Sequence, residues 1–106
     1  MKLLAGIKKL FGSPTGPGLD EMIAQGAKII DVRTPAEFAG GHVKDAVNIP
    51  LSTLGARLGR FKKDEAIITC CASGIRSRSA KALLQANGFT NVHNGGSWHK
   101  VKQYKA

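Results

Sequence analysis

Residues 66–76 read AIITCCASGIR, and this stretch predicts a strand, a loop and the start of a helix in direct succession. The run 66–70 is short, apolar and β-branched, as expected of a buried strand. Gly74 interrupts the loop, and residues 75–87 carry apolar side chains at helical spacing. A thiol between such a strand and helix suits a thiolate, because loop N–H groups and the helix dipole favour negative charge. Cys71 is therefore the candidate nucleophile.

The loop after Cys71 carries groups that would activate a thiol. The pKa of a thiol falls at a helix N-terminus and near arginine, and the loop amides and Arg76 offer both influences. The resulting thiolate could attack a sulfane sulfur, a phosphoryl group or a disulfide, and the N–H donors would hold the charge that forms. The competing interpretation makes Cys71 a small buried hydrophobe at a strand end.

Strands that alternate with helices predict a small parallel α/β sheet with helices on both faces. The expected strands are residues 27–32, 46–49, 66–70 and 91–93, and the expected helices are 19–25, 35–39, a helix capped by Ser52, 75–87 and 97–104. The pair Gly95-Gly96 would turn the chain from the last strand into the last helix. Ligands bind such sheets at the carboxyl ends of the strands, where Cys71 lies.

The charge of the chain favours anionic ligands. The 106 residues suffice for one domain with a single core, and 16 Lys and Arg against 7 Asp and Glu leave a formal net charge of +9. Such a surface attracts small oxyanions or an acidic partner protein. Few aromatic side chains lie between the basic ones, so the stacking surface of single-strand binders is not indicated and no nucleic acid is expected.

The two cysteines, Cys70 and Cys71, are adjacent. Neighbouring residues of a strand point to opposite faces, so a structural disulfide between them is geometrically poor. The cysteine usage is therefore typical of a reducing compartment, and we expect a cytoplasmic protein. Two adjacent thiols and three scattered histidines match no metal-ligand spacing, and neither a metal nor a cofactor is implied.

Residues 1–17 are interpreted as a basic amphipathic helix followed by a Gly/Pro hinge, ahead of a domain over residues 18–106. Lys8 and Lys9 interrupt the apolar run, so the segment is too short for a secretory signal or a membrane span. The helix could pack on the domain, or it could contact a membrane surface or a partner protein.

Several motifs in the chain resemble those of the rhodanese family. Residues 71–77, CASGIRS, resemble its active-site loop, C-x-x-G-x-R. Residues 31–50, DVRTPAEFAGGHVKDAVNIP, resemble its upstream signature, D-V-R-x-x-x-E-[FY]-x-x-G-H-I-x-x-A-x-N-I-P. Residues 88–96 contain its G-[FY]-x-x-V and G-G elements in the right order. The resemblance spans residues 19–98, and it implies a rhodanese-like fold and a single-domain thiosulfate sulfurtransferase.

The resemblance also implies a role for each residue of the loop. Cys71 would take a sulfane sulfur from thiosulfate or a related donor as a persulfide and pass it to cyanide or a thiol. Arg76 would help bind the oxyanion of the donor, and the loop amides would stabilise the persulfide. The substrate-binding residues would be Ala72, Ser73, Gly74, Ile75 and Arg76. Asp31 and Arg33 resemble the family's ion pair near the site, although they could serve the fold alone.

Two other functions compete with a Cys71 sulfurtransferase. Counted from Cys71 the loop is C-x4-R, but counted from Cys70 it is C-x5-R-S, the spacing of cysteine phosphatases. The position of Gly74 and the end of the apolar strand favour Cys71, which leaves Cys70 to fill the core or to act as a resolving thiol. The net charge also suits a module that carries sulfur to, or docks with, an acidic partner protein.

Simple structural interpretations account for three further side chains, those of Glu37, His42 and Trp98. Thr34, Pro35 and Glu37 match a helix capping box, in which Glu37 is the capping carboxylate. His42 is expected as a hydrogen-bonded turn residue. Trp98 is expected to be packed, with a place at the rim of the pocket as the alternative.

Overall fold

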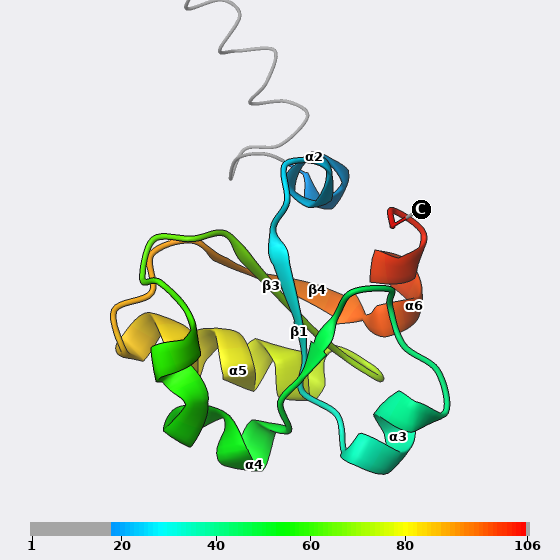
Figure 1. Ribbon diagram of the computed structural model, residues 1–106, viewed down its shortest axis with the longest axis horizontal. Helices are drawn as coiled ribbons and strands as arrows, with labels where there is room; N and C mark the ends of the chain where they lie inside the picture. The colour runs from blue at the N-terminus through cyan, green and yellow to red at the C-terminus, as the bar shows by residue number, and fades with distance from the viewer. Residues whose placement is uncertain (1–17, 106) are drawn as a thin grey trace, which may run out of the picture.

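A parallel sheet with the strand order β2-β1-β3-β4 lies at the centre of the computed structural model, which describes residues 18–105 (Figure 1). The strands are β1 Lys28–Asp31, β2 Val47–Asn48, β3 Ile67–Cys71 and β4 Val92–Ser97. The helices are α2 Leu19–Ala24, α3 Pro35–Ala39, α4 Leu51–Leu54, α5 Ile75–Ala86 and α6 Trp98–Lys102, with the 3-10 helix η1 Gly55–Arg60 after α4. The expected N-terminal helix lies outside the described residues. In residues 18–105 no helix is long and apolar enough to cross a bilayer.

Helices cover both faces of the sheet, and each face has its own hydrophobic cluster (Figure 1). The cluster packed by α4 and α5 includes Ile30 and Ile67, and the cluster packed by α2 and α6 includes Ile29 and Ile68. Successive strand residues alternate between the two clusters, because side chains along a strand point to opposite faces. The expected α/β fold, with a parallel sheet between two layers of helices, is confirmed.

The helix that Ser52 was expected to cap begins earlier than the sequence suggests. Pro50 occupies the cap position in an extended conformation, and α4 starts at Leu51, so Ser52 lies inside the helix. The α-helix ends at Leu54 and continues as the 3-10 helix η1. Glycine weakens an α-helix, and the glycines at both ends of the Gly55–Gly59 stretch explain the change to a tighter and shorter form.

The strand β4 continues past its expected end, because a β-bulge absorbs an extra residue. Thr69 of β3 pairs with Asn94, but the next residue of β3 pairs with Gly96, which leaves Gly95 unpaired. The Gly-Gly pair that was interpreted as a turn is therefore part of the sheet. The bulge keeps β4 beside β3 up to the end where Cys71 lies.

Gly95 is buried at the point where α6 packs on the sheet. A Cβ atom at this position would lie 2.7 Å from Val101 Cγ2, 2.8 Å from Ile68 Cγ2 and 3.0 Å from the Thr69 carbonyl oxygen. Contacts this short force the neighbouring groups apart, and the backbone of β3 is held by the sheet. Close packing therefore requires glycine at the bulge.

We expect Gly95→Ala to lower the free energy of unfolding by about 1–3 kcal/mol, because it overpacks the core between β4 and α6. Urea denaturation measures the change. Gly55→Ala is the matched control, since its Cβ would meet nothing within 4 Å and the backbone there is helical. Equal losses in the two variants would show that the close packing at Gly95 is not the cause.

Candidate active site

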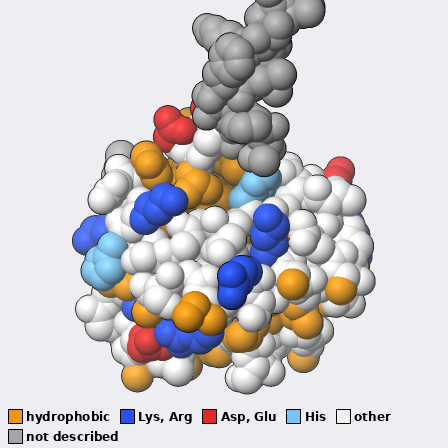
Figure 2. Space-filling model, turned by 180° about the vertical axis from the view of Figure 1, so that it is seen from behind, with side chains coloured by type: hydrophobic (Ala, Val, Ile, Leu, Met, Phe, Trp, Pro, Cys, Tyr) orange, Lys and Arg blue, Asp and Glu red, His pale blue; other side chains and the backbone are white. Residues whose placement is uncertain are grey.

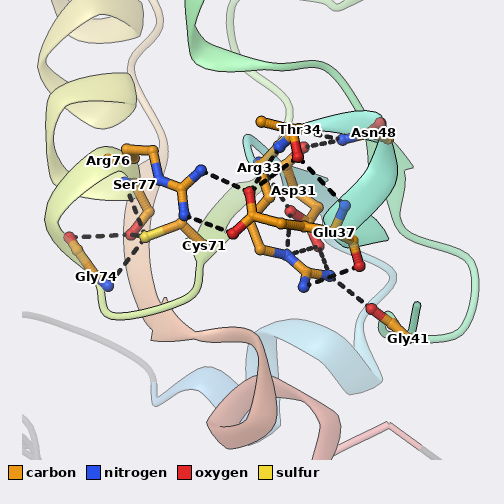
Figure 3. A network of polar contacts seen from close by, with 10 residues as sticks. All are labelled: Asp31, Arg33, Thr34, Glu37, Gly41, Asn48, Cys71, Gly74, Arg76 and Ser77. Atoms are coloured by element: carbon orange, nitrogen blue, oxygen red, sulfur yellow. Dashed lines mark hydrogen bonds and ion pairs between the residues drawn. The ribbon is translucent and has the colours of Figure 1, made fainter. Parts of the chain in front are cut away.

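Cys71 is the last residue of β3, and its Sγ atom lies against the first turn of α5 (Figure 3). The Gly74 N–H donates a hydrogen bond to Sγ at 2.9 Å and the Ser77 N–H donates at 3.4 Å. The hydroxyl of Ser77 lies 3.5 Å from the same sulfur. The side chain of Cys71 is buried. The loop thus places several donors around one sulfur atom at the carboxyl end of a central strand.

The surroundings of Cys71 favour its thiolate. Burial opposes ionisation, but it is outweighed by hydrogen bonds from the Ser77 hydroxyl and from the amides of Ser77, Gly74 and Ser73, so the pKa of Cys71 lies below its ordinary value. The helix α5 is 12 residues long, and its N-terminal dipole acts in the same direction. Thiolate is the nucleophilic form of cysteine, so this site is suited to nucleophilic chemistry.

The loop depends on the glycine at its centre. Gly74 has φ 104°, a left-handed conformation that residues with a side chain rarely adopt. A Cβ atom there would also lie 3.3 Å from the Cα of Gly96 in the bulge of β4. The glycine lets the loop close on the sheet and turn its amide toward Sγ.

Cys70 lies on the opposite face of the sheet from Cys71. Its side chain belongs to the cluster beneath α2 and α6, together with Ile29 and Val101. Burial and the nearby carboxylate of Asp31 raise the pKa of Cys70 to about 12. Cys70 therefore fills the core, as one interpretation of the sequence expected, and its position argues against a phosphatase that uses it as the nucleophile.

Asp31 and Arg33 form the expected ion pair at the end of β1. Arg33 Nη2 lies 2.8 Å from Asp31 Oδ2, and both side chains are almost completely buried. The guanidinium also donates to the carbonyl oxygens of Gly41 at 2.7 Å and Glu37 at 3.3 Å, and it lies over the ring of Trp98. The hydrogen-bond acceptors of Arg33 lie in β1 and around α3, so the geometry supports a structural role for the pair beside the Cys71 loop.

Arg76 is paired with Glu37, a contact that the sequence interpretation missed (Figure 3). Arg76 Nη1 lies 2.8 Å from Glu37 Oε1, and Nη2 lies 3.1 Å from Oε2. Glu37 also accepts a hydrogen bond from the Thr34 amide, so it has the expected capping role as well. Arg76 first, and then Thr34, lower the pKa of Glu37 to about 2. The available signal was that both residues belong to the family motifs.

A second missed contact joins the loop to β4. The Ser77 hydroxyl lies 2.6 Å from Asn94 Oδ1, which also accepts a hydrogen bond from the Gly96 amide at 2.9 Å. The amide nitrogen of Asn94 donates to the Gly74 carbonyl at 3.3 Å. Asn94 thereby fixes the side chain that is hydrogen-bonded to Cys71. No pattern in the sequence singled it out, because Asn94 falls between the expected strand 91–93 and the glycine pair that was interpreted as a turn.

The remaining expected residues lie on the outside of the loop or in the scaffold. Ala72, Ser73 and Ile75 are exposed at the surface of the loop. His42 forms a hydrogen bond with the Phe38 carbonyl, and Trp98 packs against the cluster beneath α2 and α6, as expected. Within residues 18–105 no three His, Cys, Asp or Glu side chains gather to form a metal site.

The sequence model of the rhodanese-like domain matches residues 17–103. This chain belongs to the rhodanese-like domain family. The Cys71 loop and the two ion pairs, Asp31–Arg33 and Glu37–Arg76, therefore lie within one domain of known fold.

Individual members of the family show how far the similarity extends. The uncharacterized protein YqhL of Bacillus subtilis is 43% identical over 68 residues, which cover 64% of this chain and 54% of YqhL. The chain thus spans about half the length of that relative. The thiosulfate sulfurtransferase PspE of Escherichia coli is 36% identical over 78 residues, which cover 72% of this chain and 75% of PspE. Relatives named as sulfurtransferases support this class of activity at the level of the family.

The solved structure of the human single-domain sulfurtransferase TSTD1 superimposes on this rhodanese-like domain with a TM-score of 0.73 at 26% identity. The alignment covers 83% of this chain and 92% of TSTD1. The human protein therefore has the same fold over almost its whole length.

We expect Cys71 to form a thiolate at lower pH than an ordinary cysteine, while Cys70 stays protonated. The ultraviolet absorbance of the thiolate, followed as the pH is raised, measures this. Cys71→Ser should abolish the early transition, and Cys70→Ser should keep it. Ser77→Ala should move the transition to higher pH, because a hydrogen bond that lowers the pKa of Cys71 is lost, whereas Ser79→Ala, at an exposed serine of the same helix, should not. A transition that survives Cys71→Ser would contradict the assignment.

Proposed function

We propose that this protein is a sulfurtransferase in which Cys71 accepts a sulfane sulfur and carries it as a persulfide. The observation that supports this most directly is the cradle of N–H donors around Cys71 Sγ, which favours a thiolate and can hold negative charge. Membership of the rhodanese-like family and the name of the relative PspE support thiosulfate as a donor.

In the first step the Cys71 thiolate attacks the outer sulfur of thiosulfate. A bond forms between Sγ and that sulfur, the S–S bond of thiosulfate breaks, and sulfite leaves with the bonding electron pair. The amides of Gly74 and Ser77 already donate to Sγ, and the amides of residues 72–76 would donate to the negative outer sulfur of the persulfide. Arg76 is the basic side chain of the loop, and it would bind the sulfonate oxygens of the donor.

In the second step a thiophilic acceptor attacks the outer sulfur of the persulfide. Cyanide would leave as thiocyanate, and a thiol would leave as its own persulfide. The bond between the two sulfur atoms breaks, and Cys71 departs as a thiolate. A low pKa makes a thiol a better leaving group, so the hydrogen bonds that activate Cys71 as a nucleophile also assist its release.

An acidic protein is the alternative to a small acceptor. The net charge is +9, and basic side chains are spread over the face shown in Figure 2. Ile75, in the first turn of α5, exposes 66% of its surface, which is unusual for a large apolar residue. Efficient persulfide formation with negligible turnover on cyanide and small thiols would favour this sulfur-carrier function.

Incubation with thiosulfate should increase the intact mass of the protein by one sulfur atom, which cyanide then removes. Cys71→Ser should abolish the increase and Cys70→Ser should retain it, because only the thiol of Cys71 has a lowered pKa. The proposed function fails if no sulfur is gained, or if the gain persists in Cys71→Ser. Hydrolysis of an aryl phosphate that depends on Cys70 would instead restore the phosphatase alternative.

Arg76→Ala should reduce kcat/KM for thiosulfate by about tenfold or more, because it removes a charged donor at the loop and leaves the carboxylate of Glu37 without its cationic partner. Arg78→Ala is the matched control, since Arg78 is an exposed arginine two residues further along α5. Steady-state kinetics with thiosulfate compare the two variants. Equal losses would contradict a specific role for Arg76.

A further inference from the structure

Arg76 is the only basic residue between Cys71 and the end of its loop, and its charge is already compensated within the chain. Both nitrogens at the tip of the guanidinium face the two oxygens of Glu37, at 2.8 and 3.1 Å. Both side chains are about one-third exposed, at 36% and 37%. A negatively charged donor that approaches the loop therefore meets a carboxylate together with the arginine.

Glu37 is held in place by contacts other than the ion pair. The amide and the hydroxyl of Thr34 donate to Glu37 Oε1 at 2.9 and 3.2 Å, which anchors the carboxylate to the first turn of α3. Arg33, itself buried against Asp31, donates to the carbonyl oxygen of Glu37. Glu37 is thus part of the scaffold, whereas Arg76 reaches it from another helix through a long side chain.

We propose that Glu37 is a specificity-determining residue, which competes with the donor for Arg76 and so disfavours doubly charged donors relative to singly charged ones. This inference rests on the proposed function, and thiosulfonates, which carry one negative charge, serve as the comparison donors. The electrostatic repulsion between Glu37 and a donor grows with the negative charge of the donor. A doubly charged donor that shares Arg76 with Glu37 is therefore repelled more strongly than a singly charged one. Thiosulfate, a dianion, therefore loses more affinity than a thiosulfonate does.

The chemistry of sulfur transfer is the same for both donor classes. The Cys71 thiolate attacks the terminal sulfur of the thiosulfonate, a bond forms between Sγ and that sulfur, and the S–S bond of the donor breaks. The sulfinate leaves with the electron pair, as sulfite does from thiosulfate. The donors differ only in the charge that the loop must accept, so a comparison between them isolates the electrostatic contribution of Glu37.

Glu37→Gln tests the proposal, because glutamine retains the capping geometry at this position while it removes the charge. We expect the KM for thiosulfate to fall by about two- to fivefold, the range for a partly exposed ion pair. The KM for methanethiosulfonate should fall less, so the ratio of the two values should change. Glu21→Gln is the matched control, since it removes the same charge from an exposed residue of α2, the helix before β1, and it should leave this ratio unchanged.

A binding measurement separates this inference from the proposed function. Calorimetry would measure thiosulfate binding to Cys71→Ser and to Cys71→Ser with Glu37→Gln, neither of which can transfer sulfur. Tighter binding to the double variant would support the role of Glu37 even if the wild-type chain formed no persulfide. Persulfide formation by the wild-type chain, together with an unchanged KM ratio and unchanged binding, would overturn the inference alone. Weaker binding would also overturn it, because Glu37 would then be orienting Arg76 for the donor.

Discussion

The buried ion pair between Asp31 and Arg33 is the contact on which the arrangement of the site depends. Both charges are out of water, so they are stable only if each nitrogen of the guanidinium has a hydrogen-bond acceptor. The carboxylate of Asp31 and the carbonyl oxygens of Glu37 and Gly41 meet that requirement, and the ring of Trp98 covers the guanidinium. One charged pair thereby connects the end of β1, the helix α3 and the turn after it.

Two separate sets of contacts support the Cys71 loop. One starts from the buried ion pair, and the other starts from the bulge of β4. Arg33 holds the backbone of Glu37, whose carboxylate holds Arg76. From the other side, Asn94 of the bulge contacts Ser77 and Gly74, which both donate to Cys71. The sulfur therefore lies between two rigid supports, and preorganised donors of this kind stabilise negative charge without further rearrangement.

The expectations that came from local patterns were largely confirmed. Where they failed, another residue or another backbone arrangement nearby served the same purpose. The capping box at Thr34 and the alternation of the two cysteines follow from contacts a few residues apart, and both are present. Ser52 was a reasonable cap, but Pro50 already provides an extended residue before α4. The glycines of β4 resembled a turn, because only the register with β3 shows that one of them is a bulge.

The sequence by itself determined the succession of strands and helices along the chain, the preference for Cys71 over Cys70 as the candidate nucleophile, and the glycine that lets the loop turn. Each of these follows from the period of a strand, the chemistry of a helix terminus or the φ angle of one residue. Only the tertiary structure decided which partner Arg76 takes, since Glu37 lies 39 residues away and the fold of the chain brings α3 near the first turn of α5. A long charged side chain can pair with any of several residues that are distant in sequence. Which pair forms depends on distances in the folded chain, and no local sequence pattern encodes these distances.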